Sequence, residues 1–141
     1  MKLPPDVEFY EDAHLFLWRP HGLVNSAAVN KIVSVLGELE FSLNEPFNRF
    51  TDTLEADAVD LNFEYIIRVS LYRRQVYAKH PPIKSALLAT DATLVHYGKV
   101  HALLTQGSPI NVRVFHDRTE SASWLGVPIE LLASDLGNIE T

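Results

Sequence analysis

The chain has 141 residues with 47% hydrophobic and 21% charged residues, which suits one globular domain and excludes a disordered chain, a collagen-like repeat or a coiled coil. The net charge of −6 argues against general nucleic-acid binding, because such binding requires a surface that attracts phosphate. No cysteine is present, which excludes disulfides, thiolate metal sites, iron–sulfur clusters and thiol catalysis.

The N-terminal part is predicted to form an antiparallel hairpin and then a helix. Residues 7–10 and 14–19 are two short aromatic and apolar runs separated by a polar break. From Asn25, a residue suited to cap a helix, apolar side chains recur at steps of three and four until Pro46. The residues expected to face inward from this helix are Val29, Ile32, Val33, Leu36, Leu39 and Leu43.

The middle of the chain is predicted to contain two strands and a helix. Residues 47–53 have the pattern of a strand, and residues 55–60 are interpreted as a short acidic connection. A second helix is expected over residues 63–78, ended by the two prolines that follow His80. Its expected inward residues are Phe63, Ile66, Ile67, Leu71 and Tyr77. Residues 83–90 are mostly small or apolar and are the best candidate for a central strand.

The C-terminal part continues the same alternation. A third helix is predicted over residues 91–106, followed by a strand over 111–115. Asp117 and Glu120 have the spacing of a capping box, so a short helix is expected to run from there to Leu125. One last helical turn is expected over 127–132, and residues 134–141 are interpreted as a frayed polar tail.

The predicted order ββαβαβαβα indicates an α/β fold with a mostly parallel sheet of four to five strands and helices packed on it. The first strand of the hairpin would be the antiparallel edge. We expect a single domain over residues 1–141, with its core over about 7–133. The predicted core residues are Phe16, Leu17, Val29, Ile32, Val33, Leu36, Phe50, Ile66, Ile67, Ala86, Leu88, Leu103, Val112, Val114 and Leu125.

Several polar side chains are expected where parallel strands end, which is the edge at which α/β proteins bind ligands. These are His21, Asn25, Asp52, Thr53, Asp60, Asn62, Thr90, Asp91, His116 and Asp117. Helix capping accounts for most of them. The alternative is a metal-dependent enzyme with His21, His116 and Asp52 around the ion. No glycine-rich phosphate loop or nucleophile elbow is present, so we expect no enzyme and no cofactor.

Four stretches carry a resemblance to a known family: residues 45–52 (EPFNRFTD), 82–86 (PIKSA), 107–115 (GSPINVRVF) and 124–128 (WLGVP). Together with the order of elements, they resemble the SpoIIAA-like family of small bacterial proteins, which has the STAS fold of anti-sigma-factor antagonists. The resemblance implies a STAS-type domain of largely unassigned biochemistry. The family is also likened to the lipid-binding CRAL-TRIO fold, so a small lipid- or apolar-ligand-binding protein is an alternative function.

The chain departs from STAS antagonists at their phosphorylation site. In those proteins an Asp-Ser pair begins the second helix, and a partner kinase phosphorylates the serine. By position Asp60 matches the aspartate, whereas Leu61 replaces the serine and Asn62 follows. Because leucine cannot accept phosphate, the phospho-serine switch does not carry over.

Charges are separated around the second helix. Residues 52–64 contain five acidic residues and no base, and residues 65–90 contain five basic residues and no acid. Helix dipoles favour this order, but a partner-binding surface also accounts for it. We therefore expect a non-catalytic interaction module in the cytoplasm that binds a protein partner or a second copy of itself. The predicted binding residues are Asp52, Thr53, Asp60, Asn62, Arg68, Arg73 and Arg74.

Overall fold

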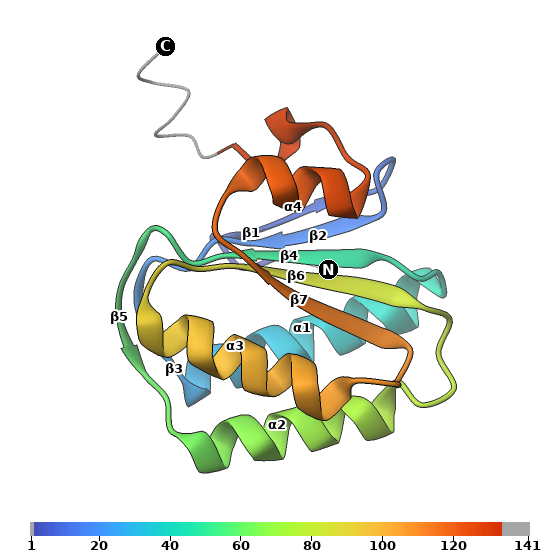
Figure 1. The fold of residues 1–141 in the computed structure, drawn as a ribbon. Helices are drawn as coiled ribbons and strands as arrows, with labels where there is room; N and C mark the ends of the chain where they lie inside the picture. Colours follow the sequence, from blue (N-terminus) through green and yellow to red (C-terminus); the bar gives the residue numbers. More distant parts are fainter. Residues whose placement is uncertain (1, 134–141) are drawn as a thin grey trace.

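The computed structural model describes residues 2–133, in which a five-stranded sheet lies between two layers of helices (Figure 1). The strand order is β1-β2-β4-β6-β7. These strands are β1 (Val7–Tyr10), β2 (Leu15–Trp18), β4 (Asn48–Asp52), β6 (Ile83–Leu88) and β7 (Ile110–Phe115). Strand β1 pairs antiparallel with β2, and all other neighbours in this sheet are parallel. The predicted α/β class and the antiparallel edge strand are confirmed.

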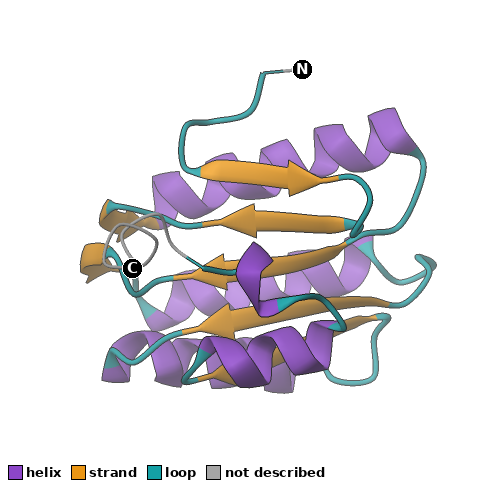
Figure 2. Ribbon diagram, turned by 90° about the horizontal axis from the view of Figure 1, so that it is seen from above, coloured by secondary structure: helices purple, strands orange, loops and turns teal. Residues whose placement is uncertain are grey.

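Helices cover the two faces of the sheet unequally. The three longer helices α1 (Ser26–Leu43), α2 (Phe63–Val76) and α3 (Ala92–Thr105) lie on one face. The short helix α4 (Arg118–Leu125) and the 3₁₀ turn η1 (Ile129–Leu131) lie on the other, as Figure 2 shows from above. The predicted polar tail over residues 134–141 lies outside the described residues.

Each α-helix begins at a capping side chain whose oxygen accepts a hydrogen bond from a first-turn amide. Asn25 accepts from the amide of Ala28, Asn62 from Tyr65, Asp91 from Leu94 and Asp117 from Glu120, at 2.8–3.0 Å. Four of the polar residues predicted at the strand ends therefore serve to start helices.

A second, two-stranded sheet corrects one sequence interpretation. The sequence predicts an acidic connection over residues 55–60, but most of this segment forms β5 (Ala56–Asp60), which pairs parallel with β3 (Gly22–Asn25). The pairing uses backbone groups, so the exposed acidic side chains of Asp57 and Asp60 do not oppose it. Polar, half-exposed strands of this kind have no strong hydrophobic alternation from which to predict them.

Both faces of the main sheet are apolar. On the α1 side, Phe16 and Trp18 pack with Ile32, Leu36 and Leu39. On the α4 side, strand residues pack with the C-terminal segment, in a cluster that includes Leu15, Leu17, Phe50, Leu88, Leu125 and Leu132. Most predicted core residues are buried or half-buried accordingly.

The prediction of inward residues is wrong for α3 and for part of α2. Leu103 is 68% exposed, and Phe63 and Leu71 are also exposed. The buried positions of α3 are instead Leu94, Gly98 and Thr105. A Cβ atom at Gly98 would lie 2.6 Å from Leu87 Cδ2, so glycine is what allows α3 to approach the sheet this closely. Because glycine and threonine are not hydrophobic, a prediction based on hydrophobicity does not identify them as the buried positions of α3.

This packing predicts a large difference between two leucines. Leu88→Ala removes a fully buried side chain from the central strand β6 and should lower the free energy of unfolding by about 2–5 kcal/mol. Leu103→Ala should change it by no more than about 0.5 kcal/mol, because that side chain is mostly in water. Urea unfolding of the two variants measures both values, and equal losses would contradict the assigned face of α3.

Candidate functional site

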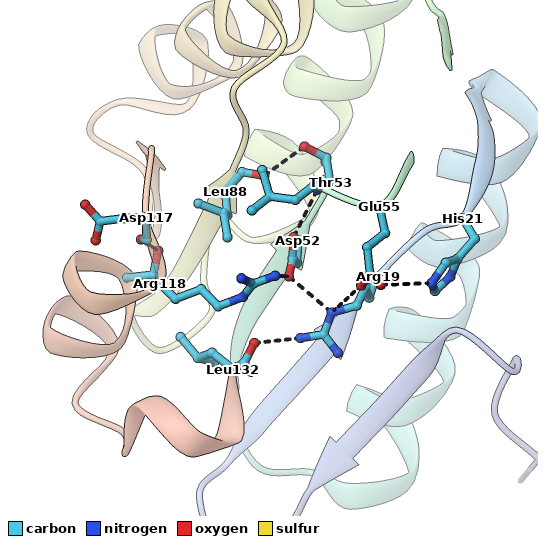
Figure 3. Close-up of polar contacts among 11 residues, drawn as sticks. Arg19, His21, Asp52, Thr53, Glu55, Leu88, Asp117, Arg118 and Leu132 are labelled. Carbon is cyan, nitrogen blue, oxygen red and sulfur yellow. Dashed lines mark hydrogen bonds and ion pairs between the residues drawn. The ribbon is translucent and has the colours of Figure 1, made fainter. Parts of the chain in front are cut away.

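The carboxyl end of β4 holds a buried ion-pair cluster centred on Asp52 (Figure 3). The Asp52 side chain is fully buried. Its Oδ2 atom accepts hydrogen bonds from Arg19 Nε at 3.1 Å and from Arg118 Nη2 at 2.7 Å. Its Oδ1 atom accepts a hydrogen bond from the amide of Leu54 at 3.0 Å. The carboxylate thus has a donor on each oxygen.

Arg19 links this carboxylate to two further groups. Its Nη2 atom donates to the carbonyl oxygen of Leu132 at 2.6 Å, and its Nε atom lies 3.3 Å from Glu55 Oε2. The other Glu55 oxygen lies 3.7 Å from Nε2 of His21, which is exposed. The cluster contains two guanidinium groups and two carboxylates, so its charges are balanced.

The geometry gives no support to a metal site here. Arg19 and Arg118 occupy Asp52 Oδ2, and His116 is directed elsewhere, with Nδ1 3.3 Å from the carbonyl oxygen of Ala89. Within residues 2–133 no group of three or more His, Asp or Glu side chains is placed to hold a metal ion. The Asp52 cluster is therefore a structural ion-pair network.

The other predicted residues near the strand ends have separate environments. Thr53 is buried, and its Oγ1 atom donates to the Leu88 carbonyl oxygen at 2.8 Å. Asp60 ends β5 and is exposed, whereas Asn62 caps α2. The structure brings Asp52 and Thr53 together at the end of β4 but leaves Asp60 and Asn62 apart from them, on the way into α2.

The basic residues after Asn62 do not share one surface. Arg68 is exposed, and Arg74 donates from Nη1 to the carbonyl oxygens of Leu104 and Gln106 at the end of α3. Arg73 is half-buried and contacts α3. Lys84 lies in β6, where its Nζ atom donates to the carbonyl oxygen of Trp124 in α4. The separation of charge in the sequence is therefore not a separation in space.

A second polar cluster, which the sequence analysis missed, lies between α2 and α3. Arg73 Nη1 lies 3.0 Å from His101 Nε2, and His101 Nδ1 lies 2.6 Å from Ser70 Oγ. Since an arginine only donates, His101 Nε2 is the acceptor and Nδ1 carries the proton. Ser70 Oγ accepts the hydrogen bond from Nδ1 and donates its own hydrogen to the carbonyl oxygen of Ile66 at 2.6 Å. This chain of bonds fixes His101 as a neutral imidazole.

Next to it, the start of β4 contributes a second buried guanidinium. Arg49 donates from Nη2 to Glu40 Oε1 at 2.8 Å, and the Tyr77 hydroxyl donates to the same oxygen. The Arg49 guanidinium carbon lies 4.9 Å from the ring centre of Phe47 and 5.1 Å from that of Tyr77. Its Nε and Nη1 atoms are buried and have no hydrogen-bond partner in the described part of the chain.

Burial dominates the titration of this second cluster. It lowers the pKa of His101 to about 3, with a further contribution from the adjacent Arg73 charge. Burial also lowers the pKa of Arg73 to about 10, and the like charge of Arg49 acts in the same direction. Near neutral pH, His101 is therefore uncharged while both arginines are charged.

A cavity adjoins this cluster, between the sheet and helices α1, α2 and α3. Its volume is about 150 Å³, and both Arg73 and His101 form part of its wall. Most of the wall is apolar, with contributions from Val33, Leu61, Ile66, Val69, Leu87 and Leu94. Half-buried residues that were predicted for the core, such as Val29 and Val33, line this space.

One sequence signal points to the second cluster. Ile66, Ser70, Arg73 and Tyr77 follow each other at steps of four, three and four, so they lie along one face of α2. The prediction from hydrophobicity includes Ile66 and Tyr77 of this face but leaves out Ser70 and Arg73, which are polar.

Comparison with known proteins relates the fold to a solved structure. No family model matches the chain, and no curated protein matches its sequence. An uncharacterized protein of the DUF3478 family from Shewanella loihica, with a SpoIIAA-like fold, is similar in structure, with a TM-score of 0.50. The two sequences are 16% identical, and the match covers 84% of this chain and 89% of the other. The chain thus has a SpoIIAA-like fold, as the sequence analysis predicted.

The described helices were also compared with the requirements for crossing a membrane. None of those within residues 2–133 combines the length and the apolar character that a membrane crossing requires. The longest, α1, has 18 residues and includes a lysine and two glutamates along its length.

The neutral, buried state of His101 predicts a specific pH dependence. The unfolded chain takes up a proton near the ordinary histidine pKa of 6.5, whereas the folded chain does so only near 3. Stability is therefore lost as pH falls through this window. Between pH 7 and 5 the parent should lose about 1–2 kcal/mol more than His101→Gln, which keeps one donor and one acceptor but does not titrate.

Urea unfolding at the two pH values measures this difference. The matched control is His96→Gln, which changes an exposed histidine of the same helix and should leave the parent's pH dependence intact. An unchanged pH dependence in His101→Gln would contradict the assigned protonation state.

Proposed function

We propose that this chain is a non-catalytic protein-interaction module of STAS type, which binds a protein partner or a second copy of itself through α1 and α2. The observation that carries the proposal is a set of large apolar side chains left in water on these two helices. Phe41 is 90% exposed and Tyr72 is 53% exposed, and Leu71 and Val76 are exposed beside Tyr72 on α2. The SpoIIAA-like fold supports a module of this type.

The two aromatic residues border a hollow between the helices. Its volume is about 660 Å³, and Ser34 and Gly37 of α1 keep it open because their side chains are small or absent. Phe41 and Tyr72 line it from α1 and α2 respectively. Exposed aromatic residues around a hollow are typical of interaction sites, where a partner's side chain fills the space and covers the rings.

Charged residues lie on the same helices. Arg68 and Arg74 of α2 are exposed, as is Glu38 of α1, which lines the hollow. Such charges contribute to the rate and specificity of association more than to its affinity. The acidic residues Asp57 and Asp60 of β5, which precedes α2, are also exposed.

The surroundings of the acidic loop favour interaction over catalysis. Arg19 and Arg118 neutralise Asp52, the most deeply buried carboxylate at the strand ends, so it is not available as a base. Leu61, where STAS antagonists have their phosphorylated serine, is half-buried against the α1 core. Association is therefore expected to be independent of phosphorylation at this position.

The test is association measured with and without the two aromatic side chains. Sedimentation velocity over a range of concentrations detects self-association, and immobilised protein captures a partner from lysate of the source cells. The Phe41→Ser/Tyr72→Ser variant should lose the complex, with a dissociation constant at least about tenfold higher than that of the parent.

The matched control is Leu103→Ser, which removes an equally exposed apolar side chain from α3 and should leave the complex unchanged. A parent that stays monomeric at every concentration and captures no partner would overturn the proposal. A complex that persists in the double variant would show that the interaction surface lies elsewhere.

A further inference from the structure

The cluster between α2, α3 and the start of β4 contains more positive than negative charge. Arg49 and Arg73 both carry a positive charge, but within residues 2–133 Glu40 is the one carboxylate that approaches them. Glu40 forms its ion pair with Arg49 at 2.8 Å. Within the described residues, no carboxylate lies within 4.0 Å of the Arg73 guanidinium.

His101 does not supply the missing negative charge. It accepts one hydrogen bond from Arg73 as a neutral imidazole. A guanidinium has five N–H donors, and Arg73 uses only a small part of them on His101 and Tyr77. Arg73 is half-buried, and a guanidinium with N–H donors to spare pairs well with an anion.

The space beside Arg73 is apolar and of limited size. Its volume of about 150 Å³ equals that of engineered protein cavities which bind benzene. Around it, Ile66, Val69 and Leu94 present aliphatic surface. A hydrocarbon group of about six carbon atoms fits this volume.

The cavity adjoins the surface hollow between α1 and α2. Val33, a half-buried residue of α1, lines both spaces. We expect a small solute to enter beside this residue, because side-chain rotation is fast compared with ligand exchange.

We propose that this cavity is a binding site for a small apolar carboxylic acid of about the size of benzoate. The hydrocarbon part lies among Ile66, Val69 and Leu94, and the carboxylate pairs with the Arg73 guanidinium. A carboxylate is favoured over other anions because its two oxygens match the planar fork of an arginine. The site does not depend on the proposed interaction surface, since Phe41 and Tyr72 do not line the cavity.

The test uses benzoate and benzyl alcohol, which share a ring and differ in charge. Isothermal titration calorimetry of the full chain should give a dissociation constant for benzoate below about 1 mM, and binding of benzyl alcohol at least about tenfold weaker. Arg73→Met should weaken benzoate to the level of benzyl alcohol. Arg73→Lys, which keeps the charge without the fork, should bind with intermediate affinity.

Two further variants separate the site from the rest of the protein. Ser85→Ile fills the cavity from the floor of β6 and should abolish binding of both probes. Arg68→Met removes an exposed arginine from the same helix and should bind as the parent does. Circular dichroism checks that each variant is folded.

Three results would overturn the proposal: no binding of either probe to the parent, equal affinity for benzoate and benzyl alcohol, or unchanged benzoate binding in Arg73→Met. Even if Arg73→Met does not fold, the comparison of benzoate with benzyl alcohol on the parent chain tests whether binding requires a carboxylate. These results are distinct from a failure of the interaction surface, which is measured by association and not by calorimetry with small molecules.

Discussion

The ion-pair network around Asp52 is the interaction that ties α4 and the C-terminal segment to the main sheet. Asp52 receives Arg19 from the end of β2, Arg118 from the start of α4 and a backbone amide from the loop before β5. Arg19 also holds the carbonyl oxygen of Leu132, after the 3₁₀ turn. Because a buried charge left without its partner is costly, separating these segments at this point destabilises the fold.

The two polar clusters differ in net charge, and this difference suggests a structural role for one and a ligand-binding role for the other. At the carboxyl ends of the strands, Arg19 and Arg118 face Asp52 and Glu55, so the cluster is neutral without any ligand. At the other cluster, Arg49 and Arg73 face one carboxylate. The first cluster explains how the fold is held together, and the second leaves a charge for a ligand to neutralise.

Helix α2 takes part in both proposals through two different faces. Tyr72 is directed to solvent beside the hollow, whereas the next residue, Arg73, contacts His101 of α3. Adjacent residues on a helix are about 100° apart, so one helix can serve an outer surface and an inner cavity. The cavity and the surface can therefore be altered separately by substitution.

The sequence predicted those parts of the fold that rest on local chemistry. Caps such as Asn25 and Asp117, the apolar stripe of α1 and the small, apolar strand β6 all have local physical causes. The pairing of β3 with β5 was not predictable from local pattern, because it depends on backbone contacts between segments far apart in the sequence. The inward positions of His101 and Thr105 depend on hydrogen bonds that only the folded chain provides.

The same reasoning explains which site residues were found. Asp52 and Thr53 were placed correctly at the end of a strand, but the sequence does not show that Arg19 and Arg118 would neutralise Asp52 from segments 33 and 66 residues away. Arg73 was chosen as part of a charged surface, whereas Arg49 and His101 were not chosen at all. Long-range charge pairing decides the role of each of these residues.

Native-state hydrogen exchange of Asp52→Asn, compared with Asp60→Asn, tests the central role of the Asp52 network most directly. Asp52→Asn leaves two guanidinium groups without their shared charge and should cost about 3–5 kcal/mol, with faster amide exchange in both β5 and α4. Asp60→Asn, at an exposed position, should change stability by no more than about 0.5 kcal/mol. Exchange in Asp52→Asn that matches the parent in both β5 and α4 would contradict this account.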